Sequence, residues 1–314
     1  MARLRRFSSL IVLLLIGLLV GSINHHFFDP MNLTRIATAS TIPLLMALGG
    51  MFVIQMGSID LSVEGVVAIA AVCFSLLISN TLNAHSIGFW ALPVAVVVGA
   101  LMGLVNGLLQ VRLRIPSFIG TLGLGFVGIG LATALLQGNT VRVVDMDVRA
   151  VALYRVLGLP LSVWIVGVAL IIAHVVSRHT VLGRHALAIG GAEDLARLNG
   201  VQVGRIRIAV FALAGGFYGL AAILAVAQFG QGHALIAQGQ LFTAITAIVV
   251  GGCSLAGGNG SPFGTLLGVL IVVVLSNGMV LMGIPPYVQQ GVQGVLIIVA
   301  VAMALDRAKA RVVK

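Results

Sequence analysis

Two acidic side chains, Asp60 and Glu64, are the carboxylates closest to the apolar interior of this 314-residue chain. They lie four residues apart, so on a helix they would share one face. Carboxylates at such a depth could contact a solute or carry a proton. A structural role explains the same pattern, because Asp60 or Ser62 could cap the following helix while Glu64 complements its dipole. We favour capping, and we keep all three residues as candidates for a functional site.

A second group with possible chemistry is the charged segment from Gly190 to Gly200, which interrupts long apolar runs. Its acids stand at the expected start of a short helix, its arginine stands near the end, and its last glycine is a natural C-cap. Two leucines three residues apart can point the same way and form a small apolar plug for a partner. An ordinary connecting loop with a solvated helix would give the same pattern. The side chains concerned are Glu193, Asp194, Leu195, Arg197 and Leu198.

Other motifs that could carry chemistry are weak. The glycine-rich stretch Gly251–Ser261 lacks the Lys-Ser/Thr pair that closes a phosphate loop, so we interpret it as a tight turn with close helix packing. Cys73 and Cys253 lie in apolar runs and are expected to be packing residues. No metal-ligand spacing and no paired nucleophile and base are found, so we expect no metal site and no intramembrane enzyme.

The elements that must position these residues are transmembrane helices. The chain is 60% hydrophobic and 8% charged, its mean hydropathy is +1.16, and apolar runs of near span length recur throughout. These runs do not alternate as barrel strands do, so we predict an all-α polytopic membrane protein. The ten predicted spans are 8–27, 37–56, 63–82, 88–110, 116–137, 160–177, 207–228, 240–254, 262–282 and 287–305.

The net charge of +10 is spread over the predicted span boundaries, and we interpret it as a topology signal and not as one for nucleic acid. With the N-terminus inside, fourteen basic residues fall on the cytoplasmic side and four fall outside. Ten spans place both termini in the cytoplasm. The longest external loop is then 138–159, which contains Asp145 and Asp147.

Matching segments recur in the same order at offsets of 165 to 171 residues. Because the first copy of each predicted span runs opposite to the second, the two halves, about 37–137 and 207–305, would be inverted repeats. Such repeats are typical of transporters, although chance matches are expected in a glycine-rich chain. The matches pair Ala47–Phe52 with Ala212–Phe217, Asn106-Gly107 with Asn277-Gly278, and Ile115-Pro116 with Ile284-Pro285.

Five motifs together resemble the membrane permease of ribose-type sugar ABC importers, the second carbohydrate uptake class. They are Gly57–Gly65, Arg112–Gly123, Leu182–Val203, Ala247–Gly268 and Asn277–Leu305. The resemblance covers residues 35 to 305 and implies that the loop at about 178–206 carries the coupling helix that docks into an ATPase subunit. In the family Gly is usual at Glu64 and Ser58, and Asn at Ala192. The Glu64-Gly65 pair is similar to nucleoside-type permeases.

The resemblance implies a non-catalytic permease that forms one transmembrane domain, 1–314, in the bacterial inner membrane. ATP and magnesium would be bound by the ATPase partner and not by this chain. A periplasmic or lipid-anchored binding protein would deliver a monosaccharide or polyol, and a second copy or a paralogue would complete the pore within the lipid. The predicted pathway or gate residues are Asp60, Ser62, Glu64, Asn106, Phe118, Asn277 and Gln289.

Two other classes of function remain open. Nucleoside-type and branched-chain amino-acid ABC permeases share the general pattern. An ion-coupled secondary transporter using Asp60 and Glu64 is the alternative from a different class.

Overall fold

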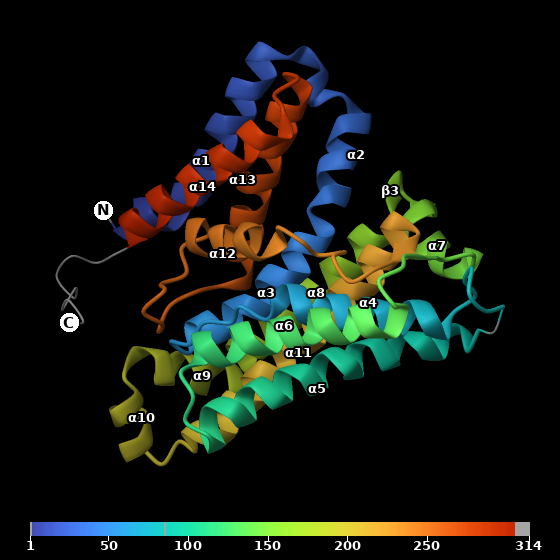
Figure 1. The fold of residues 1–314 in the computed structure, drawn as a ribbon. Coiled ribbons are helices and arrows are strands. Elements are labelled where there is room, and N and C mark those ends of the chain that lie inside the picture. The colour runs from blue at the N-terminus through green and yellow to red at the C-terminus, as the bar shows by residue number, and fades with distance from the viewer. Residues whose placement is uncertain (1, 85, 305–314) are drawn as a thin grey trace.

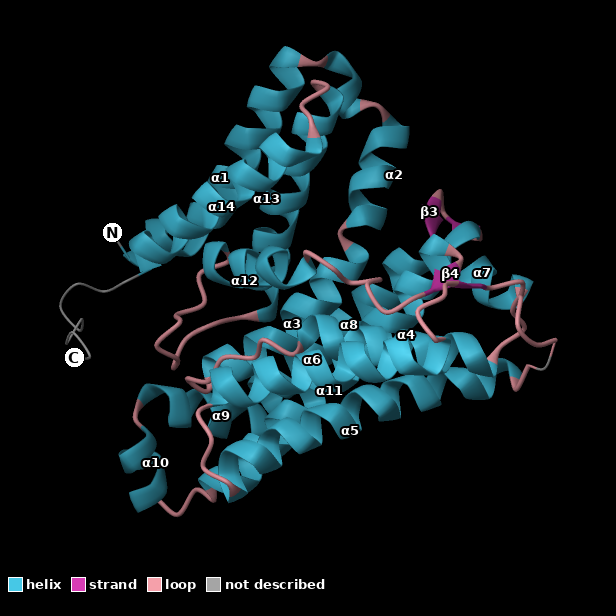
Figure 2. Cartoon of the chain, in the orientation of Figure 1, coloured by secondary structure: helices cyan, strands magenta, loops and turns pink. Residues whose placement is uncertain are grey.

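The computed structural model describes residues 2–84 and 86–304, and helices make up most of it (Figure 1; Figure 2). Up to residue 160 the elements are α1 (Ala2–Ile23), the 3-10 turn η1 (His25–Phe28), α2 (Pro30–Ala39), α3 (Thr41–Gln55), α4 (Val63–Leu77), the 3-10 turn η2 (Gly88–Trp90), α5 (Ala91–Arg112), α6 (Ser117–Leu136), β1 (Val141–Arg142), α7 (Met146–Leu153), β2 (Arg155–Val156) and β3 (Leu159–Pro160). Beyond it are α8 (Leu161–His179), α9 (Val181–Gly191), α10 (Glu193–Leu198), α11 (Val203–Phe229), β4 (Gln231–Gly232), α12 (Gln240–Val250), α13 (Pro262–Leu281) and α14 (Pro286–Ala304).

Each predicted span contains a helix, so the all-α multi-pass architecture is confirmed. Among the described residues, six helical stretches are long and apolar enough to cross a membrane: Pro30–Gln55, Gly88–Arg112, Ser117–Leu136, Leu161–His179, Val203–Phe229 and Pro262–Leu281. The first of these bends at Ser40, between α2 and α3 (Figure 1). α4 and α12 are shorter apolar helices. The number of crossings therefore stays a prediction.

The most extensive helix pair in the bundle is α5 with α11, where glycines let two backbones approach. Gly99 and Gly103 on α5 face Gly215 and Gly219 on α11, and a Cβ at Gly99 would lie 2.8 Å from the Gly219 nitrogen. Small residues at four-residue spacing permit such packing between helices in lipid. Gly65 plays the same part where α4 packs on α6. These glycines fix the depth and rotation of the helices that carry the buried polar groups.

The two hexapeptides of the predicted repeat, Ala47–Phe52 in α3 and Ala212–Phe217 in α11, lie against each other. Phe52 and Phe217, the last residue of each, are stacked with ring centroids 6.1 Å apart and 22° between the planes. Equivalent residues meet in this way when they lie beside a twofold axis. The contact is compatible with the repeat, whose symmetry stays a prediction.

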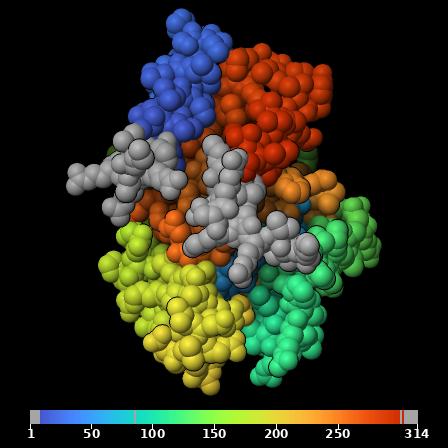
Figure 3. All heavy atoms as spheres, turned by 90° about the vertical axis from the view of Figure 1, so that its left-hand side faces the viewer, coloured from blue at the N-terminus to red at the C-terminus, as the bar shows by residue number. Residues whose placement is uncertain are grey.

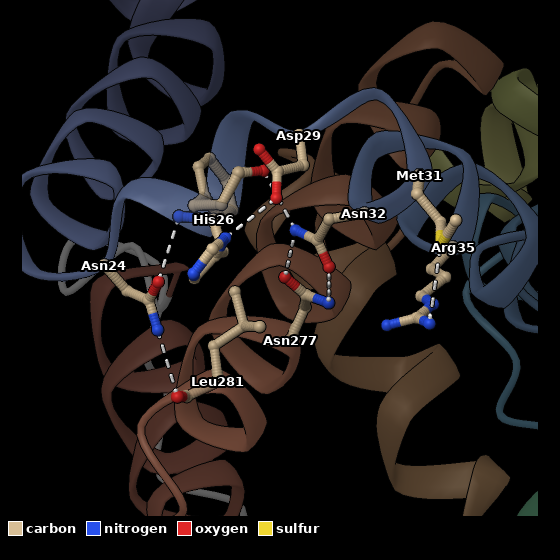
Figure 4. A network of polar contacts seen from close by, with 9 residues as sticks. Asn24, His26, Asp29, Met31, Asn32, Arg35, Asn277 and Leu281 are labelled. Carbon is tan, nitrogen blue, oxygen red and sulfur yellow. Dashed lines mark hydrogen bonds and ion pairs between the residues drawn. The ribbon is translucent and has the colours of Figure 1, made fainter.

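A second group of helices, α1, α12, α13 and α14, packs on one side of this bundle and is joined to it through α2 (Figure 1). α1 lies against α13, where a Cβ at Gly278 would lie 2.7 Å from a methyl of Val20. Asn32 on α2 and Asn277 on α13 exchange two amide hydrogen bonds of 3.0 and 2.9 Å (Figure 4). The amide pair ties the bend in the chain to α13.

Short strands and α7 cover the end of the bundle that lies farthest from α9 and α10 (Figure 2). β1 pairs antiparallel with β4, and β2 pairs with β3. The predicted loop 138–159 is therefore partly ordered structure. Asp145 caps α7 by accepting hydrogen bonds from the backbone nitrogens of Asp147 and Val148. Residues 305–314, with four of the basic residues used to predict orientation, lie outside the described part of the chain.

Candidate functional site

The segment predicted to contact a partner is a pair of short helices, α9 and α10, that projects from the end of the bundle (Figure 1; Figure 3). α10 begins with Glu193 and Asp194, as expected from the helix dipole. Gly200 follows the helix with φ +81°, the left-handed conformation that glycine adopts most readily. Leu195 is 61% exposed and Leu198 is 82% exposed. The segment therefore presents two large apolar side chains to its surroundings.

The Glu193 carboxylate fastens α10 to α11. It accepts hydrogen bonds from Arg207 at 2.5 Å and from Arg197 at 3.0 Å, and both contacts are ion pairs. Partial burial alone would raise the pKa of Glu193, but the hydrogen bonds and charges of Arg207, and then of Arg197, outweigh it and hold the pKa below its ordinary value. Glu193 and Arg197, predicted as partner contacts, are thus engaged within the chain. Sequence reasoning did not select Arg207, which lies fourteen residues away on another helix.

Three backbone segments meet where α9 ends. The Gly258 nitrogen donates a hydrogen bond of 2.9 Å to the carbonyl oxygen of Gln55, the last residue of α3. A Cβ at Gly190 would collide with that same carbonyl, and one at Gly257 would lie 2.9 Å from the Gly190 Cα. We call Gln55, Gly190, Gly257 and Gly258 the glycine junction. The glycine-rich stretch therefore makes a close contact, as predicted, and the contact reaches the segment that carries α10.

Asp60 is buried in a network that joins three parts of the fold. Its carboxylate accepts hydrogen bonds from the Ser62 nitrogen at 2.9 Å, the Ser62 hydroxyl at 2.6 Å and the Tyr218 hydroxyl at 3.1 Å. The Asn106 amide donates to Ser62 Oγ at 2.7 Å. α4 begins at Val63, so Asp60 precedes the helix and the predicted shared face with Glu64 is wrong.

The capping prediction also needs correction. Ser62 occupies the N-cap position of α4, but its side chain accepts no capping hydrogen bond. Asp60 instead holds the turn before the helix and reaches Tyr218 on α11. Glu64 does lie in the first turn, as predicted, yet its Oε1 accepts a hydrogen bond of 3.0 Å from the Leu241 nitrogen. Glu64 therefore caps the N-terminus of α12, a helix 177 positions away.

The remaining predicted pathway residues are dispersed. Asn277 is engaged with Asn32, and the Gln289 amide donates to the Ile284 carbonyl at 2.8 Å. Phe118 lies near the start of α6 and is 49% exposed. The structure thus brings Asp60, Ser62 and Asn106 together and leaves the others apart.

An all-helical bundle with six helical stretches long and apolar enough to cross a membrane, counted over the described residues, defines a polytopic membrane protein. The chain belongs to the branched-chain amino acid transport system / permease component family, whose family model matches residues 32–301.

Individual relatives match nearly the whole chain. The ribose import permease protein RbsC of Escherichia coli K12 is 35% identical over 298 residues, covering 94% of this chain and 92% of the relative. RbsC of Bacillus subtilis is 32% identical, covering 98% and 94%. The L-arabinose transport system permease protein AraH of Escherichia coli K12 is 31% identical, covering 91% and 86%. No solved structure matches. The resemblance to ribose-type permeases is confirmed.

Proposed function

We propose that this chain is the permease subunit of a binding-protein-dependent ABC importer and carries a monosaccharide or polyol across the bacterial inner membrane. A separate ATPase subunit binds ATP and magnesium and docks on α10. A binding protein delivers the solute at the opposite end, and a second permease, a copy or a paralogue, completes the pore. The family match and the names of the full-length relatives support this proposal.

The observation that carries the docking step is the exposure of Leu195 and Leu198 on a helix whose position is fixed. The ion pairs of Glu193 hold the backbone of α10 against α11, so the two leucines are presented without freedom to fold back. An apolar pair of this kind gains by burial in a groove of another protein. Asp194 is placed beside it and is proposed as the polar edge of the same contact.

The topology follows from the charges and the repeat. We propose one transmembrane domain with ten crossings, both termini in the cytoplasm, and inverted halves at about 37–137 and 207–305 with the coupling loop 178–206 between them. The stack of Phe52 on Phe217 supports the inverted halves. In alternating access, two related halves exchange conformations about a central site.

Two solute classes are suggested by the names of relatives and of the family, sugars and branched-chain amino acids. Sugars are better supported, because the full-length relatives at 31 to 37% identity include permeases named for ribose and arabinose. A secondary-transport mechanism through Asp60 and Glu64 is less well supported, since both carboxylates already hold hydrogen bonds within the fold.

The test is uptake into proteoliposomes that contain the permease with its ATPase and binding protein. Radiolabelled D-ribose and L-leucine are offered in parallel, with ATP inside, without ATP, and with ATP plus a protonophore. We expect accumulation of D-ribose that requires ATP and survives the protonophore. Accumulation of L-leucine alone would assign the amino-acid class, and uptake abolished by the protonophore without any ATP requirement would assign secondary transport.

A further inference from the structure

A cavity of about 620 Å³ opens between the bend of α2 and α3 and the adjoining ends of α11 and α12. None of the predicted pathway residues lines it. Volumes between 300 and 1,000 Å³ are usual for small-molecule sites, which are mostly apolar with a few placed polar groups. This cavity fits that description, because aliphatic residues and Phe229 share its wall with a small polar set. The polar set is Thr34, Arg35, Thr38, Arg155, Gln228 and Gln240.

The two amide side chains of the polar set, Gln228 and Gln240, can form hydrogen bonds with hydroxyl groups of a solute. Gln228 donates through Nε2 to the Thr41 hydroxyl at 2.7 Å, and this bond fixes its side chain. Gln240 Oε1 is buried and has no hydrogen-bond partner within residues 2–84 and 86–304. An unpaired buried acceptor is costly, and a solute hydroxyl that donates to it would remove the cost. Phe229, which is 54% exposed, adds an apolar face of the kind that C–H groups pack against.

The charges of the cavity have one sign. Arg35 and Arg155 line it, and in the part of the chain that the structure describes neither forms an ion pair with a carboxylate. The Arg35 guanidinium instead lies 3.7 Å from the Met31 sulfur (Figure 4). A guanidinium only donates hydrogen bonds, so both arginines favour oxygen-rich solutes and repel cations. They are also two of the four basic residues on the predicted external side, the side that membrane proteins leave poor in basic residues.

We propose that this cavity receives the solute on its way into the pore, and that it binds a polyhydroxylated solute bearing no positive charge. Arg35 and Arg155 donate to solute oxygens, Gln240 accepts from a hydroxyl, and Glu64 acts as a positioning residue. Glu64 caps α12 at Leu241, the residue after Gln240, so the carboxylate of α4 holds the helix turn that carries Gln240. The proposal rests on the proposed function and adds to it a location for the solute and the residues that contact it.

The first experiment plugs the cavity. Thr38→Cys and, as a matched control at the same end of the molecule, Asn139→Cys are treated from outside with a membrane-impermeant sulfonate thiol reagent, and ATP-driven D-ribose uptake is measured. We expect modification of Thr38→Cys to lower uptake by about tenfold or more, since the adduct would occupy space in the cavity that the solute needs. Excess D-ribose should slow the modification. Asn139→Cys should react and keep its uptake, and the unsubstituted chain controls for Cys73 and Cys253.

The second experiment removes the charges. In Arg35→Gln and Arg155→Gln we expect the KM for D-ribose to rise about tenfold, because one charged donor is lost from solute contact. Arg142→Gln, an external arginine that does not line the cavity, should leave the KM unchanged.

The outcomes separate the two proposals. Absence of uptake by the unsubstituted importer would contradict the proposed function. Normal uptake by modified Thr38→Cys would overturn the cavity as part of the path. A KM increase that disappears at saturating binding protein, without any effect of the thiol reagent, would assign the arginines to docking of the binding protein and would also overturn the proposal.

Discussion

The Tyr218 hydroxyl donates a hydrogen bond of 3.1 Å to the Asp60 carboxylate and so joins α11 to the turn that precedes α4. Both side chains are buried, and Phe217, the neighbour of Tyr218, stacks on Phe52 of α3. The carboxylate also holds both donors of Ser62. One polar group therefore connects α11 with the turn before α4, next to the aromatic stack that joins α11 to α3.

The more hydrogen bonds of the Asp60 carboxylate a substitution removes, the more it should destabilise the fold. Tyr218→Phe leaves the Ser62 bonds and should lower the free energy of unfolding by about 1–3 kcal/mol, while Asp60→Ala should lower it more because three donors lose their acceptor. Asp60→Asn keeps an acceptor for Ser62 and should retain much of the transport. The measurements are thermal unfolding in detergent and D-ribose uptake. Loss of transport in a well-folded Asp60→Asn protein would show that the acid itself contacts solute or carries a proton.

The contact of Glu64 with α12 changes what its substitution should do. From the sequence resemblance, Glu64→Gly would be tolerated, because glycine is the usual residue there. In this structure the Leu241 nitrogen would lose its acceptor, and a lost cap costs about 1 kcal/mol. We expect faster amide exchange at the start of α12 in Glu64→Gly and near-normal exchange in Glu64→Gln. Equal exchange in all three proteins would contradict the capping role.

Coupling should depend on the Glu193–Arg207 ion pair, but the two charges should be able to change places. Glu193→Gln and Arg207→Gln should each lower uptake relative to ATP hydrolysis, and the double swap Glu193→Arg with Arg207→Glu should restore part of the coupling. The ion pairs hold the pKa of Glu193 below its ordinary value of 4.5. The attachment therefore contributes stability that is fully present at neutral pH and is lost as pH falls below the ordinary value and through the lowered pKa. Uptake and ATP hydrolysis are measured together, and a swap no better than the single variants would argue against the pair.

The exposed leucines of α10 should be required for coupling. Leu195→Asp or Leu198→Asp places a carboxylate where an apolar groove of the ATPase is proposed, and burial of that charge is unfavourable. We expect uptake to fall while the permease stays folded and inserted. Leu157→Asp is the matched control, because Leu157 is 87% exposed at the opposite end. Wild-type uptake and ATPase stimulation in both α10 variants would remove this segment from the docking contact.

Single cysteines can determine the orientation. Asn139→Cys should react with an impermeant thiol reagent from outside, whereas Ala192→Cys should react only after the membrane is opened. Asn139 is preferable to Gly138, whose φ of +78° strains any residue with a side chain. Reversed labelling would overturn the predicted orientation and the inverted repeat that depends on it.

Local patterns were sufficient for most of the fold. Apolar runs indicated every long helix, and the acids of α10 and Gly200 indicated where that helix begins and ends. Asp145 ahead of a helical stretch is a capping signal that could have revealed α7. Contacts between distant positions left no local trace. Glu64 lies in the first turn of its own helix, so its sequence neighbours suggest a role there, whereas its acceptor serves Leu241.

The cavity was not predicted for the same reason. Arg35, Arg155 and Gln240 belong to separate elements, and only the bend at Ser40 and the strand pairing bring them to one place. The candidate site chosen from the sequence was centred on two acidic residues, Asp60 and Glu64. Those acids are engaged in holding helices together, which is the commoner use of a buried polar group.

The glycine junction has a mechanical consequence. Where two helices touch through long side chains, rotamer changes can absorb a small displacement of one against the other. Gly190, Gly257 and Gly258 have no side chains, and the backbone of α9 lies directly on the Gln55 carbonyl and the loop before α13. A displacement of α10 is therefore passed to α3 and α13 with little loss, because no side chains lie between the backbones to absorb it. The junction would therefore transmit a movement of α10 with little deformation. How well it does so would depend on backbone geometry and not on the chemistry of side chains.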